Sequence, residues 1–123
     1  MSSTRVLIVD DHPVFRGVAR ELLEARGYTV VAEADGMATA VEALQRCVPD
    51  AVLLDVCLGE ESGFDVARAL TGMRPDVAVL LVSADEEDRS SERVLRCGAR
   101  GFVLKARLVK TDLSAFWGHA GGA

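Results

Sequence analysis

Short apolar runs alternate with amphipathic segments along most of this 123-residue chain. The runs hold four to six residues and are rich in β-branched side chains, which favours strands. We expect five strands, at residues 6–9, 29–32, 51–54, 77–82 and 101–104. Because these runs are apolar almost throughout, helices should cover both faces of the sheet that they form.

The segments between the strands carry apolar residues at helical spacing, with Pro and Gly near their ends. We expect helices after Asp11 and up to Gly27, and at about 37–48, 63–73, 86–97 and 109–117. The first half of the fourth helix has almost nothing to bury and should be loosely held. The stripes expected to face the sheet are Val14, Val18, Leu22 and Ala25, then Met37, Val41, Leu44 and Val48, then Val66, Leu70 and Met73, and finally Val109, Leu113 and Phe116 or Trp117.

Five strand-helix units with short connections predict right-handed crossovers and a doubly wound parallel sheet. Among α/β folds we expect the flavodoxin-like (βα)5 arrangement with strand order 2-1-3-4-5, because its switch point lies between the first and third strands. Residues 1–118 should form a single domain, with 119–123 as a short flexible C-terminal tail and no output domain in this chain.

The composition narrows the class of protein. A net charge of −5 and a pI near 5.0 argue against a surface for nucleic acid or anionic membrane, so we expect no direct nucleic-acid binding and no membrane contact. No apolar run is long enough to span a membrane, and because residues 1–4 lead directly into the first expected strand we expect no signal segment. The odd count of three cysteines favours free thiols in a reducing compartment, which makes the cytoplasm the expected location.

Polar residues follow four of the expected strands. Asp10 and Asp11 come after the first, Asp55 after the third, Ser83 after the fourth and Lys105 after the fifth. Open α/β sheets bind their ligands at the carboxyl ends of the strands, so these groups should converge there. Such a set suits a metal-assisted phosphoryl transfer to an aspartate.

Three clustered carboxylates need a cation, because each pair repels by roughly 4 kcal/mol at ~4 Å and an effective dielectric near 20. Mg²⁺ is the expected ion, since it prefers oxygen ligands and keeps open positions for phosphoryl oxygens. Other readings stay open: Asp11 could simply cap the first helix, Asp55 could be a loop acid, and Ser83 could only bond nearby backbone. His12 is interpreted as a residue at the helix start and not as a ligand.

The segment 10–16, with the sequence DDHPVFR, resembles the receiver domains of bacterial two-component response regulators, most closely the NarL and FixJ branch. The order of an acidic pair, a lone Asp, a Ser and a Lys along nearly the whole chain supports the resemblance. It implies a phosphoacceptor at Asp55 and a Mg²⁺ ion held by Asp11, Asp55 and the backbone carbonyl of Cys57, with Asp10 acting largely through water. It also implies a switch hydroxyl at Ser83, a backbone phosphate contact at Ala84, a phosphate counterion at Lys105 and a switch aromatic at Phe102.

The resemblance implies a partner as well, because a sensor histidine kinase would donate the phosphoryl group. Phosphorylation would then switch the conformation of the surface made by the fourth helix, fifth strand and fifth helix. Homodimerisation and the downstream protein partner stay open, and no turnover of an external substrate is expected. Ala106 stands where many receivers have a cis-Pro, so we expect a trans Lys105–Ala106 peptide.

Three alternatives come from other classes. A receiver-like protein-binding module would work without phosphorylation. A flavodoxin-like cofactor protein would need a Gly-rich loop that binds phosphate, and this chain has no such motif. A hydrolase of the haloacid dehalogenase kind would need an acid at position 12, where this chain has His12.

Overall fold

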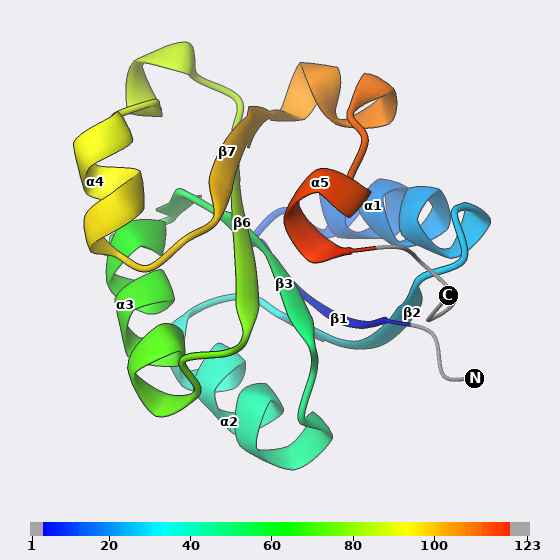
Figure 1. Ribbon diagram of the computed structural model, residues 1–123, viewed down its shortest axis with the longest axis horizontal. Coiled ribbons are helices and arrows are strands. Elements are labelled where there is room, and N and C mark those ends of the chain that lie inside the picture. Colours follow the sequence, from blue (N-terminus) through cyan, green and yellow to red (C-terminus); the bar gives the residue numbers. More distant parts are fainter. Residues whose placement is uncertain (1–3, 119–123) are drawn as a thin grey trace.

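The computed structural model describes residues 4–118, apart from the side chain of Ser91, so the tail expected at 119–123 lies outside the described residues. Its centre is a five-stranded parallel sheet in the order β2-β1-β3-β6-β7 (Figure 1). With the two-residue strands β4 and β5 set aside as a small antiparallel hairpin, this is the predicted flavodoxin-like order, which is confirmed. The strands are β1 (Arg5–Val9), β2 (Thr29–Ala34), β3 (Ala51–Asp55), β4 (Cys57–Leu58), β5 (Glu61–Ser62), β6 (Ala78–Ser83) and β7 (Gly101–Leu104).

Helices cover both faces of the sheet. The α-helices are α1 (Pro13–Ala25), α2 (Met37–Cys47), α3 (Gly63–Met73), α4 (Ser91–Arg96) and α5 (Ser114–Trp117), and the 3-10 helices are η1 (Glu86–Asp88) and η2 (Lys105–Lys110). Helices α2, α3 and α4 lie on one face, and α1, η2 and α5 lie on the other (Figure 1). No helix in the described residues is long and apolar enough to cross a membrane.

The sheet is buried on both sides, as its apolar strands predicted. In β1, Leu7 and Val9 pack against α2 and α3, whereas Val6 and Ile8 pack against α1. Side chains of a strand alternate between the faces, so this split requires every position of β1 after its first residue to be apolar. All four are 0% exposed. The sheet is therefore a rigid frame for the loops at its carboxyl edge.

The face that α1 buries is not the predicted one. Val14 and Val18 are 82% and 57% exposed, and the helix instead buries Ala19 and Leu23 against the sheet. The sequence of α1 carries two apolar stripes, and the stripe that packs on the sheet contains the small side chain of Ala19. Ala25 is exposed as well, so the prediction was wrong for Val14, Val18 and Ala25.

Residues at the ends of helices were also assigned to the core incorrectly. Val48 follows α2 in the left-handed conformation with φ of 48° and is 53% exposed. Met73 ends α3 and is 40% exposed, and Val109 in η2 is 61% exposed. At a helix end the chain turns away from the sheet, so the helical period no longer decides burial.

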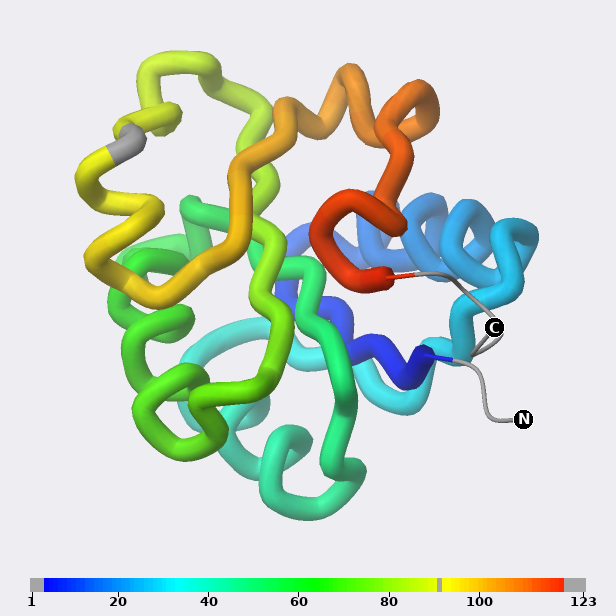
Figure 2. Tube along the Cα trace, viewed as in Figure 1, coloured from blue at the N-terminus to red at the C-terminus, as the bar shows by residue number. Residues whose placement is uncertain are grey.

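The fourth expected helix is divided. Residues Glu86–Asp88 form the 3-10 helix η1, and α4 begins only at Ser91. None of the residues of η1 is buried, which is the physical reason for the break. The tube in Figure 2 shows this turn leaving the end of β6 and returning through α4 to β7. The last expected helix is likewise divided into η2 and α5, with Leu113 and Trp117 buried as predicted.

Gly63, the first residue of α3, offers a test of how tightly the site is packed. A Cβ atom there would lie 2.1 Å from the backbone oxygen of Asp55. We therefore expect Gly63→Ala to lower the free energy of unfolding by about 1–3 kcal/mol in urea denaturation. Gly72→Ala, in the same helix with no atom within 4 Å of its Cβ, should instead raise it by about 0.5–1 kcal/mol. Equal shifts for the two variants would contradict the close approach of α3 to β3.

Candidate functional site

Polar side chains converge at the carboxyl edge of the sheet, as predicted. Asp10 follows β1, Asp55 ends β3 and Ser83 ends β6, and these three side chains are almost fully buried. Lys105 follows β7 at the start of η2. Parallel pairing of β1, β3, β6 and β7 places the ends of these strands at one edge, so residues far apart in sequence become neighbours.

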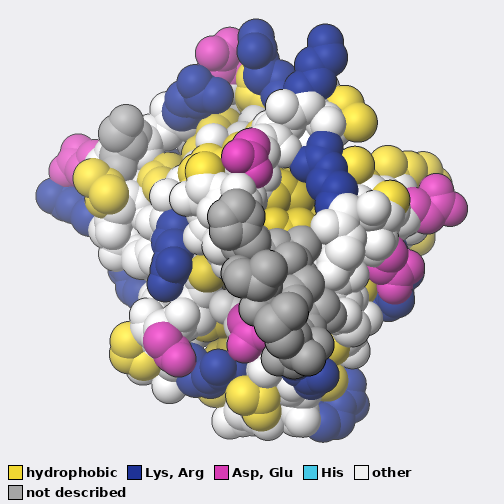
Figure 3. Space-filling model, turned by 45° about the vertical axis from the view of Figure 1, so that its right-hand side comes forward, with side chains coloured by type: hydrophobic (Ala, Val, Ile, Leu, Met, Phe, Trp, Pro, Cys, Tyr) yellow, Lys and Arg dark blue, Asp and Glu magenta, His cyan; other side chains and the backbone are white. Residues whose placement is uncertain are grey.

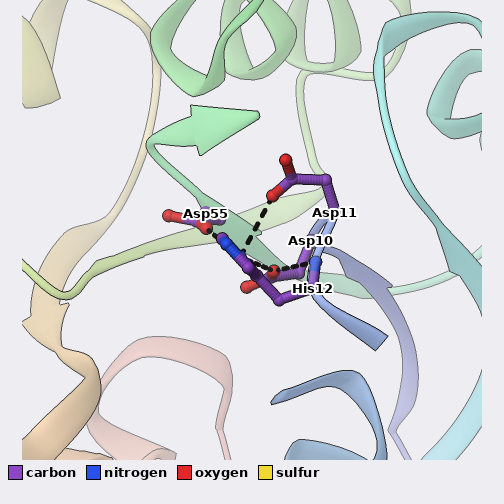
Figure 4. A group of neighbouring side chains, drawn as sticks. All are labelled: Asp10, Asp11, His12 and Asp55. Atoms are coloured by element: carbon purple, nitrogen blue, oxygen red, sulfur yellow. Dashed lines mark hydrogen bonds and ion pairs between the residues drawn. The ribbon is translucent and has the colours of Figure 1, made fainter. Parts of the chain in front are cut away.

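The acidic side chains form one compact cluster (Figure 4). Potential ligand atoms from Asp10, Asp11, His12 and Asp55 all lie within 4.8 Å of one another. Asp11 Oδ1 is buried and accepts no hydrogen bond within the described residues, although His12 Nδ1 lies 3.1 Å away. Clustered carboxylate oxygens at this separation fit a small divalent cation that prefers oxygen ligands. The donor set therefore fits Mg²⁺.

Lys105 supplies positive charge inside this cluster. Its Nζ lies 2.7 Å from Asp10 Oδ2 and 3.0 Å from Asp55 Oδ2, and 4.1 Å from the centre of the Phe15 ring. Burial alone would lower the pKa of Lys105, but hydrogen bonds to the two carboxylates and their charges outweigh it and raise this pKa. The ammonium therefore stays charged, and the phenyl ring helps to hold it over the acids.

Burial is the main influence on Asp55. It raises the pKa of this carboxyl above the usual value, and the hydrogen bonds from the Cys57 N–H and Lys105 oppose that shift in part. The Cys57 N–H donates to Asp55 Oδ1 at 3.1 Å, while Lys105 contacts Oδ2. Both carboxylate oxygens are thus held in fixed directions, so Asp55 is not the loop acid considered as an alternative.

His12 does more than begin a helix. It is the N-cap residue of α1, in agreement with its interpretation as a residue at the helix start. Asp11 is therefore not the N-cap residue of this helix. Its Nδ1 lies 3.0 Å from Asp10 Oδ1 and 3.1 Å from Asp11 Oδ1, so the ring rests among the carboxylates (Figure 4). Sequence reasoning missed this contact, although the position directly after the acidic pair was a signal for it.

The predicted site residues do not all share one pocket. The pocket beside Asp55 is lined by His12, Asp55, Cys57, Ser83, Ala84, Asp85, Asp88 and Lys105. Phe102 lies elsewhere, in a hollow shared with Arg89, Val94, Leu95 and Gly101. Asp88 was not expected at the site, because its segment was predicted to be the opening turn of a regular helix. The Lys105–Ala106 peptide is trans, as predicted, since the described residues contain no cis peptide.

Comparison with known proteins agrees with this geometry. A family model for the response regulator receiver domain matches residues 6–113. A probable transcriptional regulatory protein NarL of Mycobacterium tuberculosis is 41% identical over 102 residues, which cover 82% of this chain and 47% of that protein. The chain spans about half the length of the curated relatives it matches.

Solved structures give the same result. The signal receiver domain of the putative response regulator NarL from Mycobacterium tuberculosis has a TM-score of 0.80 and 36% identity, covering 89% of this chain and 90% of that chain. A response regulator protein from Burkholderia pseudomallei, solved with a phosphorylated aspartic acid, a calcium ion and citrate, has a TM-score of 0.82 and 26% identity, covering 92% of this chain and 66% of that chain.

Proposed function

This chain belongs to the response regulator receiver domain family of two-component systems, and we propose that it accepts a phosphoryl group on Asp55 from a sensor histidine kinase. The observation that carries the proposal is the position of Asp55. The Asp55 side chain is 3% exposed, lines a pocket and lies 3.0 Å from the ammonium of Lys105, with two further acids beside it.

In the proposed reaction a carboxylate oxygen of Asp55 attacks the phosphorus of a phosphohistidine. The P–N bond breaks, its electron pair stays on the imidazole nitrogen, and that nitrogen takes up a proton. Lys105 remains beside the new acyl phosphate as a counterion, and the Ser83 hydroxyl and the Ala84 N–H would donate hydrogen bonds to its oxygens. The domain mainly positions these groups, because the donor already carries a reactive phosphoryl group.

Mg²⁺ is proposed as the cofactor of this reaction. Asp11, Asp55 and the backbone carbonyl of Cys57 would hold it, with Asp10 acting largely through water, and when bound it would neutralise charge on the carboxylates and the phosphoryl group. Support comes from the Burkholderia pseudomallei structure, in which a phosphorylated aspartic acid and a calcium ion occur together.

The partners follow from this role. The sensor kinase would phosphorylate the chain in the cytoplasm. Phosphorylation would alter the surface formed by α4, β7 and α5, which includes Phe102, and a downstream protein or a second copy of the chain would bind this surface. On the face shown in Figure 3, basic and acidic side chains are interspersed. Direct nucleic-acid binding is not part of the proposal.

Incubation with acetyl phosphate and Mg²⁺, followed by intact mass measurement, tests the proposal. We expect the chain to gain one phosphoryl group, and omission of Mg²⁺ should prevent the gain. A receiver-like binding module that works without phosphorylation would show no gain in either condition. That result would overturn the proposed function.

Lys105 provides a second test with a matched control. Lys105→Ala removes the ammonium beside Asp55. We expect phosphorylation by acetyl phosphate to slow about ten- to a hundredfold, because one charge-assisted hydrogen bond is lost. Lys110→Ala removes the exposed lysine in the same 3-10 helix and should leave the rate unchanged. Equal rates for the two variants would refute a role for Lys105.

A further inference from the structure

The Ser83 hydroxyl already donates a hydrogen bond to a carboxylate in the turn after β6. Ser83 Oγ donates a hydrogen bond to Asp88 Oδ2 at 2.5 Å and accepts one from the Asp85 N–H at 3.0 Å. Ser83 is 2% exposed. A hydroxyl has one hydrogen to donate, so Ser83 cannot serve Asp88 and a phosphoryl oxygen at the same time.

The turn holds Asp88 in the pocket where the phosphoryl group would enter. Asp88 lines that pocket together with Asp55 and Lys105. Its own N–H donates to the Asp85 carbonyl at 3.2 Å, and the Asp85 carboxylate accepts from the Glu87 N–H at 2.9 Å. These short-range bonds hold the backbone of the turn, and the Asp88 carboxylate itself is contacted by the Ser83 hydroxyl and, at 3.7 Å, by Cys57 Sγ. An incoming phosphoryl dianion would meet this negative charge directly.

We infer that Asp88 is an internal competitor of the phosphoryl group: its carboxylate holds the Ser83 hydroxyl in the unmodified protein and must leave when Asp55 is phosphorylated. Asp88 is a positioning residue in this scheme, since it acts through Ser83 and not on the reacting atoms. The inference rests on the proposed function and adds to it a residue that opposes the reaction.

The same contact links the pocket to the proposed output surface. Arg89 follows Asp88 directly, and its guanidinium carbon lies 5.5 Å from the centre of the Phe102 ring. Displacement of Asp88 from Ser83 would move its neighbour relative to that ring. No residue of η1 is buried, so few packing contacts resist this movement.

Binding of beryllofluoride, a non-covalent mimic of the phosphoryl group, tests the inference in the presence of excess Mg²⁺. We expect Asp88→Ala to bind beryllofluoride about tenfold more tightly than the unmodified chain, because Ser83 becomes free and one negative charge is lost. Glu87→Gln removes a neighbouring charge that does not contact Ser83, and it should leave the affinity unchanged.

A double-mutant cycle shows whether Asp88 acts through Ser83. In a Ser83→Ala background the gain from Asp88→Ala should fall to about threefold or less, because only charge repulsion remains. Amide hydrogen exchange without Mg²⁺ or beryllofluoride gives an independent measurement. Exchange at the Asp85 N–H should be faster in Asp88→Ala, since its acceptor hydroxyl is no longer held.

The outcomes separate this inference from the proposed function. If the unmodified chain binds beryllofluoride and Asp88→Ala binds it equally or more weakly, the role of Asp88 is overturned while the proposed function stands. The role of Asp88 is likewise overturned if the gain is as large in the Ser83→Ala background. If no variant binds beryllofluoride or is phosphorylated, both are overturned.

Discussion

Replacement of Asp55 with asparagine is expected to abolish the gain of a phosphoryl group from acetyl phosphate. The amide of asparagine is a very poor nucleophile, so the rate should fall by more than about a hundredfold and no modified species should accumulate. The fold should persist, because an amide oxygen can still accept the hydrogen bond that the Cys57 N–H donates to Asp55 Oδ1. Intact mass measurement at several times checks both rate and extent.

A control variant makes this experiment specific. Asp76→Asn changes an exposed acid outside the pocket and should be phosphorylated as fast as the unmodified chain. If Asp55→Asn gains a phosphoryl group as readily as Asp76→Asn, another residue is the acceptor and the assignment fails.

Mg²⁺ is expected to stabilise the protein strongly, and Asp11→Asn should remove that effect. An ion that binds only the folded chain adds about 2.7 kcal/mol at a concentration 100 times its dissociation constant. For a domain of this size that raises the unfolding temperature by roughly 10 °C. Asp11 Oδ1 is buried without a hydrogen bond in the described residues, which makes it available to a cation.

Thermal unfolding with and without Mg²⁺ measures this effect. Asp11→Asn should show a shift below about 2 °C, whereas Asp76→Asn should keep the full shift. Equal stabilisation of the unmodified chain and Asp11→Asn would show that the ion binds elsewhere. The Asp11 side chain is 32% exposed, so the substitution itself should cost little stability.

The sheet could be predicted from the sequence because its strands are short apolar runs with a polar residue directly after them. In β3 every residue from Ala51 to Asp55 is buried, so the run and its end are visible in the sequence. Asp10, Asp55 and Ser83 were placed correctly for the same reason: the end of a parallel strand fixes which edge a side chain occupies.

Helix faces and loop contacts could not be predicted in the same way. In α1 the apolar side chains of Val14 and Val18 form a stripe as regular as the buried one, and only packing against the sheet decides which stripe is covered. The contacts of His12 and Asp88 depend on turn geometry after a strand. No hydrophobic period marks such a turn, so the carboxylate beside Ser83 appears only in three dimensions.

Identification of the modified residue tests the central claim most directly. The chain is phosphorylated with acetyl phosphate and Mg²⁺, reduced with borohydride, which converts an aspartyl phosphate to homoserine, and then digested and sequenced by mass spectrometry. We expect homoserine at position 55 and at no other acidic position. Homoserine at Asp10, Asp11 or Asp88, or a phosphoryl group that resists the reduction, would contradict the account.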